Sequence, residues 1–236
     1  MLLEVEDLNA HYGKSHVLQG VSLSVDAGET VCLLGRNGVG KSTTLKAIMG
    51  LVPPTCGAVR LKGQAIERSK PWTIARLGIG YVPEDRRVFG SNTVHENLLL
   101  GVKAPVTGAK PAWTVDRIFE LLPRLRERSA QLAGTLSGGE QQILTIARTL
   151  VGNPEVLLVD EPTEGLAPLI VAEVEKILVE IQASGTAVLL VEQALDTAFT
   201  LATRAYVMSK GKVVWSGKMD ALKAGDEDSH RHLLAV

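Results

Sequence analysis

A glycine-rich stretch at residues 35–43 combines the residue types that bind phosphate groups. It reads GRNGVGKST and matches the pattern GxxxxGK[ST]. Glycines let backbone N–H groups approach a polyphosphate closely, a lysine can reach its β- and γ-phosphates, and a serine hydroxyl can bind Mg²⁺. The stretch therefore predicts an ATP-type site built from Gly35, Asn37, Gly38, Gly40, Lys41, Ser42 and Thr43, with Lys41 also acting in catalysis.

Two adjacent carboxylates follow an apolar run at residues 156–159. A buried strand can deliver the first of them, Asp160, to a Mg²⁺ ion at the phosphate loop, so we expect Asp160 and Ser42 to be magnesium ligands. Glu161 points in another direction, and we expect it to hold the attacking water as general base. Apolar strands with acidic ends are common, so this pair gains its meaning from the phosphate loop upstream.

A second glycine pair, Gly138-Gly139, follows Ser137. Ser137 can cap a helix that begins with these glycines, which predicts a second helix N-terminus able to bind an anion. This stretch, LSGGEQQ, resembles the LSGGQ signature of the ABC-transporter ATPase family, with Glu140 in the glutamine position. The resemblance implies a head-to-tail pair of subunits, with each ATP held between the loop of one and the Ser137 region of the other.

The same resemblance assigns roles to three further residues. Tyr12 stands where the family has an aromatic residue that stacks on adenine, the alternative being a lone surface tyrosine. Glu84 stands where most relatives have a glutamine; its carboxylate can still approach Mg²⁺ but cannot donate a hydrogen bond. Gln193 replaces the usual histidine and is expected in the catalytic set, where it can bind the γ-phosphate without becoming a cation. Ala167 replaces an aspartate of the family.

Four short strings narrow the resemblance to LivF-type ATP-binding subunits of importers for branched-chain amino acids and related amides, including urea. They are residues 82–87, 132–135, 164–168 and 191–193. The implied partners are two integral-membrane permease subunits, a second ABC ATPase and, indirectly, an external solute-binding protein. Two alternatives remain open: a lipid or lipopolysaccharide export machine, and a soluble ABC ATPase acting on DNA or ribosomes.

Composition restricts the partners and the compartment. Twenty-five Lys and Arg against 26 Asp and Glu leave a net charge of −1, so no nucleic-acid partner is expected. Two cysteines make no disulfide framework, which fits a reducing cytosol. No apolar run approaches the roughly 20 residues that cross a bilayer. These features favour a cytoplasmic protein, and the resemblance implies that it is peripheral on the inner face of the cell membrane.

The predicted elements indicate an α/β fold with a helical subdomain between two α/β portions. The resemblance implies that this is a P-loop NTPase fold of the ABC type, with a mixed-sheet core, an antiparallel edge and the helical subdomain as an insertion. Residues 1–236 are expected to form one nucleotide-binding domain, with 1–84 and 153–236 as the core and 85–152 as the helical subdomain. Strands are predicted at 2–6, 17–25, 29–34, 57–62, 79–82, 156–159, 187–191, 204–209 and 212–215. Helices are predicted at 44–50, 93–102, 115–122, 125–132, 138–150, 171–183 and 195–202. A turn is expected at 11–14, a loop at 104–111 and a solvated tail at 225–232.

Overall fold

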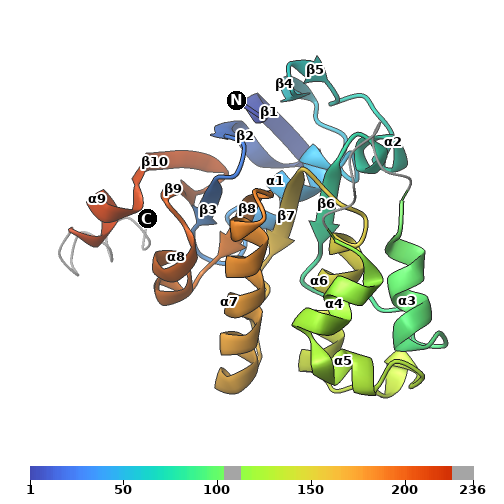
Figure 1. The fold of residues 1–236 in the computed structure, drawn as a ribbon. Coiled ribbons are helices and arrows are strands. Elements are labelled where there is room, and N and C mark those ends of the chain that lie inside the picture. Colours follow the sequence, from blue (N-terminus) through green and yellow to red (C-terminus); the bar gives the residue numbers. More distant parts are fainter. Residues whose placement is uncertain (104–112, 225–236) are drawn as a thin grey trace.

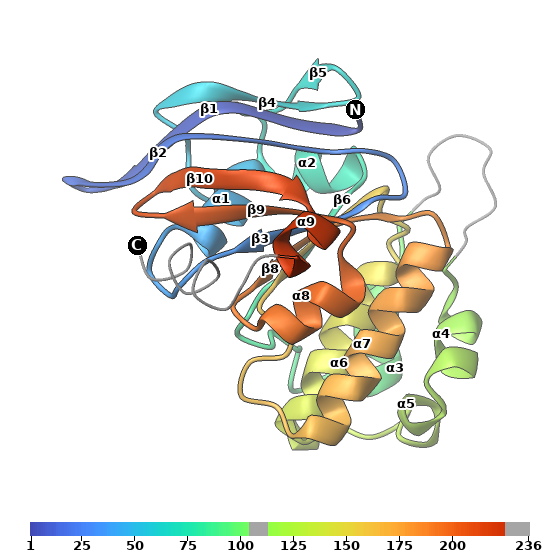
Figure 2. The same cartoon turned by 90° about the vertical axis from the view of Figure 1, so that its left-hand side faces the viewer.

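A computed structural model describes residues 1–103 and 113–224, so the loop predicted at 104–111 and the tail at 225–232 lie outside the described residues. The chain forms two sheets, with a group of helices at the opposite end of the molecule from the N-terminal strands (Figures 1 and 2). Among the described residues, no helix is both long enough and apolar enough to pass through a lipid bilayer.

The first sheet is antiparallel and has the order β2-β1-β4-β5. Its strands are β1 (Leu3–Tyr12), β2 (Ser15–Val25), β4 (Cys56–Leu61) and β5 (Gln64–Ala65). The expected strand at 2–6 and turn at 11–14 were wrong in extent, because the pairing of β1 with β2 continues to the His11–His16 and Tyr12–Ser15 pairs. The reversal therefore occupies Gly13 and Lys14, with Gly13 in the left-handed region at φ 58°.

The second sheet has six strands in the order β10-β9-β3-β8-β7-β6. They are β3 (Thr30–Leu34), β6 (Ile79–Val82), β7 (Val156–Asp160), β8 (Ala187–Glu192), β9 (Arg204–Ser209) and β10 (Lys212–Lys218). All pair in parallel except β10, which makes the predicted antiparallel edge. Every residue of β3, β7 and β8 is buried, as expected for parallel strands covered on both faces. The sequence had not predicted that the N-terminal strands form a sheet of their own.

Two apolar cores flank the six-stranded sheet. One lies between the two sheets and includes α1 (Lys41–Ile48), which contributes Leu45 and Ile48. The other lies between the six-stranded sheet and the helices at the lower end of Figure 2. Both faces of β3 and β7 are thereby covered, and these two strands carry the loops that bear the predicted site.

The helices follow the predicted order, with some differences in length. They are α2 (Pro71–Arg76), α3 (Val94–Gly101), α4 (Val115–Leu121), α5 (Pro123–Glu127), the 3₁₀ turn η1 (Ala133–Thr135), α6 (Gly138–Leu150), α7 (Pro168–Ala183), α8 (Leu195–Leu201) and α9 (Met219–Lys223). The helix predicted from residue 93 is present as α3, and a capping box of Thr93 and Glu96 fixes its start. The helix predicted at 125–132 already ends at Glu127, and α2, α9 and β5 were not predicted.

Candidate nucleotide site

The phosphate loop connects the end of β3 to the start of α1. Helix α1 begins at Lys41, three residues before the predicted start, and Gly40 is its N-cap with φ 111°. A Cβ atom at Gly35 would lie 2.6 Å from the Met208 carbonyl oxygen, so only glycine fits where the chain leaves β3. The first-turn amides of α1 have no intrahelical acceptor, which leaves them available to an anion.

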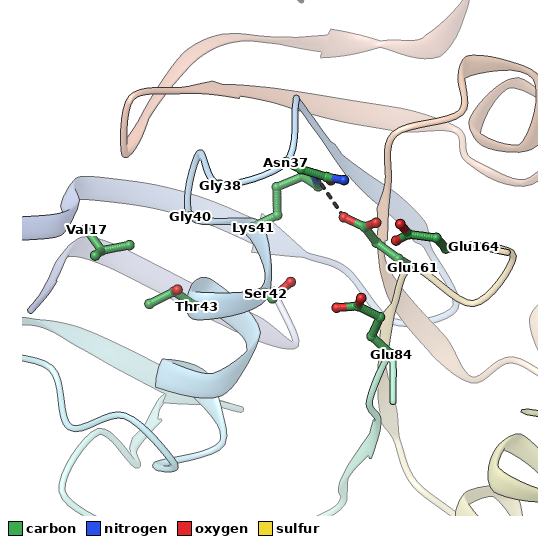
Figure 3. Close-up of a pocket in the computed structure, with 10 residues that line it drawn as sticks. All are labelled: Val17, Asn37, Gly38, Gly40, Lys41, Ser42, Thr43, Glu84, Glu161 and Glu164. Carbon is green, nitrogen blue, oxygen red and sulfur yellow. Dashed lines mark hydrogen bonds and ion pairs between the residues drawn. The ribbon is translucent and has the colours of Figure 1, made fainter. Parts of the chain in front are cut away.

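Lys41 is almost completely buried and already has partners within the chain. Its Nζ donates to the carbonyl oxygens of Gly35 at 2.8 Å and Arg36 at 3.0 Å. The same ammonium forms an ion pair with Glu161 Oε1 at 2.9 Å, and the two side chains are 3% and 7% exposed (Figure 3). The predicted phosphate-binding cation and the predicted general base therefore meet, although they are 120 residues apart in sequence (161 − 41).

The backbone turns sharply at Glu161, directly after β7. This residue has φ 42°, in the left-handed region that few side chains adopt, and its N–H donates to the Val191 carbonyl oxygen at 3.0 Å. Burial raises the pKa of Glu161, but hydrogen bonds with Glu164 and Lys41 and the charge of Lys41 outweigh it, so the pKa lies below its usual range. The hydrogen bond shared with Glu161 raises the pKa of Glu164 to about 7.

Ser42 and Asp160 bring oxygen donors together at the other side of the loop. The Ser42 hydroxyl donates to Asp160 Oδ1 at 2.8 Å, and the Tyr81 hydroxyl donates to Asp160 Oδ2 at 3.1 Å. Burial raises the pKa of Asp160, with the two hydrogen bonds acting against it. Tyr81 was missed by sequence reasoning, because nothing in the string before Glu84 distinguishes a hydroxyl aimed at the site from a core aromatic.

These oxygens fit Mg²⁺, which prefers carboxylate and hydroxyl ligands and keeps places for water and phosphate oxygens. Within the part of the chain that the structure describes, no group of three or more His, Cys, Asp or Glu side chains could hold a metal ion unaided. Two protein oxygens, from Ser42 and Asp160, therefore suit an ion that arrives together with a polyphosphate. The carboxylate of Glu84, which is exposed, faces the same pocket.

The pocket at the loop has a volume of about 290 Å³ and an open side. The loop and the start of α1 form one wall, and three carboxylates stand across from them (Figure 3). Of these carboxylates, Glu84 and Glu161 were predicted to belong to the site, whereas Glu164 was not; neither was Val17, from β2. The lining consists of Val17, Asn37, Gly38, Gly40, Lys41, Ser42, Thr43, Glu84, Glu161 and Glu164.

Two predicted residues lie outside the lining of this pocket. Tyr12 ends β1 and its side chain is 50% exposed, so its ring is accessible from solvent. Gln193 is exposed directly after β8, where its backbone N–H donates to Glu192 Oε2 at 3.2 Å. Glu192 itself is buried and accepts from the Thr163 hydroxyl at 2.8 Å, and burial raises the pKa of its carboxyl group. Neither Tyr12 nor Gln193 therefore lines the pocket that contains Lys41.

The Ser137 region lies at the start of α6, as predicted, and it too is absent from the lining of the phosphate-loop pocket. Ser137 is exposed, and Gly138 and Gly139 are half-buried. The Ser137 hydroxyl and backbone N–H donate to Glu140 Oε2 at 2.8 Å and 2.9 Å, and Glu140 also pairs with Arg128 at 3.1 Å. This helix start is therefore reachable from outside the chain.

Comparison with known proteins gives a family match over most of the chain. The model of the ABC transporter family matches residues 18–164. The sequence is 43% identical over 215 residues to the high-affinity branched-chain amino acid transport ATP-binding protein BraG of Pseudomonas aeruginosa, covering 90% of this chain and 91% of that protein. It is 33% identical to the lipopolysaccharide export system ATP-binding protein LptB of Haemophilus influenzae, covering 92% of this chain and 90% of that protein.

Solved structures show the same fold. An ATP-binding subunit of an ABC transporter superposes with a TM-score of 0.85 at 32% identity, covering 99% of both chains. A dimeric structure of a bacterial ABC transporter cassette superposes with a TM-score of 0.79 at 25% identity, covering 92% of this chain and 99% of that one. The two-sheet core and the inserted helices are thus shared with nucleotide-binding cassettes.

Proposed function

We propose, from the premise that this chain belongs to the ABC transporter family and is an ATPase of that family, that it powers an importer of branched-chain amino acids or related amides. The observation that carries the ATPase part is the pocket in which Lys41, Ser42 and Glu161 converge. The likeness to BraG supports the solute class, because that protein serves branched-chain amino acid transport.

In this proposal the residues of the pocket divide the work of hydrolysis. Amides of the loop and the ammonium of Lys41 bind the β- and γ-phosphates, and Ser42, Asp160 and Glu84 supply oxygens to Mg²⁺. When bound, Mg²⁺ neutralises charge on the phosphates. Once the phosphates of ATP replace Glu161 as the partner of Lys41, the carboxylate of Glu161 is free to accept the proton of the attacking water. Gln193 orients the γ-phosphate by a hydrogen bond, and Tyr12 stacks on the base.

The working unit of the proposal is a head-to-tail pair. Ser137, Gly138 and Gly139 are exposed or half-buried and stand apart from the chain's own loop, so a second ATPase subunit can bring its ATP to them. The dimeric cassette of the same fold supports such pairing. ATP binding would close the pair, and the helical subdomain formed by residues 85–152 would pass the motion to two permease subunits. An external binding protein would deliver the solute, with this chain on the inner face of the membrane.

A second candidate function is lipopolysaccharide export, favoured by the similarity to LptB over most of the chain. Both machines use the same hydrolysis chemistry, so the site does not separate them. The higher identity to BraG favours the importer.

The decisive experiment identifies the membrane proteins that purify with the chain from detergent-solubilised membranes. Two permease subunits that, in proteoliposomes, take up leucine or urea in an ATP-dependent manner would support the importer. The Lys41→Ala variant serves as the inactive control. Recovery of lipopolysaccharide-binding subunits would support export instead. Strong stimulation of the ATPase activity by DNA or ribosomes would contradict both.

A further inference from the structure

Arg86 lies between the loop that follows β7 and the start of α6. It follows β6 and Glu84, and its backbone is in the left-handed region at φ 45°. Its Nη2 donates to the Glu164 carbonyl oxygen at 3.0 Å. Its Nη1 fills the space beside Gly138, where a Cβ atom would collide with it. One side chain thus touches both the loop that bears the general base and the start of α6.

The chemistry of the side chain suits such a connection. A guanidinium is a rigid planar fork, so movement at one terminal nitrogen moves the other. Glu164 lies three residues after Glu161, and the Glu164 N–H donates to the Glu161 carbonyl oxygen at 3.3 Å. Displacement of the guanidinium therefore reaches the turn that aims the Glu161 carboxylate at the pocket.

The neighbouring arginine carries the same charge in a different environment. Arg87 is 73% exposed and forms an ion pair with Asp85 at 2.7 Å, on the surface. Arg86 is half-buried, and its guanidinium donates to a backbone carbonyl oxygen instead of a carboxylate. A guanidinium beside a helix N-terminus meets the positive end of the helix dipole, which favours binding of an anion there. The carboxylate of Glu140 at this helix start is already engaged by Ser137 and Arg128.

We propose that Arg86 is a positioning residue that couples the two ATP sites of a pair by connecting the Gly138 end of α6 to the loop of Glu161. The inference rests on the head-to-tail pair of the proposed function. A phosphate held by Ser137 and Gly138 belongs to the other subunit's ATP, and it attracts the guanidinium. Because the fork is rigid, the Glu164 carbonyl and the Glu161 turn respond. Occupancy of one site is thereby conveyed to the base of the other.

The test compares Arg86→Ala with Arg86→Lys and the matched control Arg87→Ala. ATPase rate is measured against ATP concentration, and nucleotide affinity is measured on dilute, unpaired chains. Arg86→Ala is expected to lower kcat about tenfold and to reduce the Hill coefficient from near its two-site limit towards one, with nucleotide affinity unchanged. Arg86→Lys keeps one contact and should recover part of kcat but not of cooperativity. Arg87→Ala should behave as the wild type.

A double-mutant cycle tests the contact itself. Gly138→Ala displaces Arg86 and also disturbs the anion site, so its cost to kcat should be smaller in the Arg86→Ala background than in the wild type. Additive costs, or wild-type kcat and cooperativity in Arg86→Ala, would overturn the role of Arg86. A wild-type rate per chain that does not depend on protein concentration would instead overturn the paired arrangement. Melting temperatures of all variants exclude misfolding as the cause.

Discussion

The chain contains two helix starts suited to phosphate, and their surroundings differ. At the start of α1 the cation is enclosed: Lys41 is 3% exposed and is neutralised by Glu161 of the same chain. At the start of α6, Ser137 is exposed and its hydroxyl turns back to Glu140 of its own helix. In the first arrangement, a carboxylate that follows β7 neutralises the ammonium at the start of α1. In the second, the Ser137 hydroxyl is bonded within its own helix turn, and the helix start faces outward.

The contrast indicates which part of the ATPase activity depends on one chain and which part requires two chains. The α1 site brings the ammonium of Lys41, the carboxylate of Glu161 and the hydroxyl of Ser42 into one pocket. The α6 site offers a capped helix N-terminus without a comparable set of groups around it. Variants of the α1 site should therefore lose ATPase activity whether or not subunits pair, and variants of the α6 site should lose it only when subunits pair.

The largest effect is expected at the buried pair. Glu161→Gln removes the proposed base and should lower kcat by about 10²- to 10⁴-fold while ATP still binds, because Lys41 is freed for phosphate. Lys41→Ala should lose both binding and turnover. Phosphate release and nucleotide binding are measured side by side, with Glu180→Gln on the exposed face of α7 as control. Full hydrolysis by the Glu161→Gln protein would contradict the assignment.

Ser137→Ala should give a smaller, assembly-dependent loss. Its kcat at concentrations where chains pair should fall about tenfold, with unchanged nucleotide affinity in dilute solution. The loss of the cap should lower the free energy of unfolding by about 1 kcal/mol. Thr93→Ala is the matched control, because Thr93 and Glu96 form the same capping box on α3. If both variants lose the same activity, the effect of Ser137 is one of stability.

Tyr12→Ala tests whether the α1 site extends to the rim of the first sheet. Loss of a stacked ring should weaken ATP affinity about fivefold, and Tyr12→Phe should retain it. Equilibrium titration with a fluorescent ATP analogue measures both, and Trp72→Ala, another exposed aromatic, serves as control. Unchanged affinity in Tyr12→Ala would make this residue a lone surface tyrosine.

The smallest effect on stability is expected away from the phosphate loop, at the ion pair of Glu29 with Arg204. Arg204 donates to both Glu29 oxygens at 2.8 Å, and these hydrogen bonds lower the pKa of Glu29 despite its partial burial. The pair therefore contributes stability above pH 4.5, the unfolded value, which is lost as the pH falls through the lower folded value. Glu29→Gln should cost about 1 kcal/mol at neutral pH.

Thermal melting at several pH values checks the sign of this effect. The difference between the wild type and Glu29→Gln should disappear in acid, whereas nucleotide affinity should stay unchanged. A difference that persists at the lowest pH would show that packing, and not charge, accounts for it. Glu6→Gln, at an exposed ion pair with Arg60, should have less effect throughout.

Local signals were enough to predict much of this fold. The strand before the loop and the helix starts at Gly138 and Thr93 each depend on a few adjacent residues. Residue patterns failed where pairing across the chain decides the structure, as in the extension of β1 to Tyr12 and the separation of the first sheet. The short elements α2, β5 and α9 span too few residues to show a period.

The site was predicted in the same uneven way. Motif spacing placed Lys41, Ser42, Asp160 and Glu161 in one pocket region, which the geometry agrees with. It gave no sign that Lys41 and Glu161 pair directly, since that contact depends on the left-handed turn at Glu161. Contributions from Tyr81, Glu164 and Arg86 were missed because each acts through a single contact that no motif encodes.

The Lys41–Glu161 pair also determines what ATP binding energy means for this enzyme. In the proposed mechanism, an incoming nucleotide replaces Glu161 as the counter-ion of Lys41, so its affinity would report the difference between two electrostatic partners and not the strength of either alone. After phosphate leaves, the carboxylate of Glu161 can form its ion pair with Lys41 again. On the proposed mechanism, the ammonium of Lys41 would thus have a counter-ion both before ATP binds and after phosphate leaves.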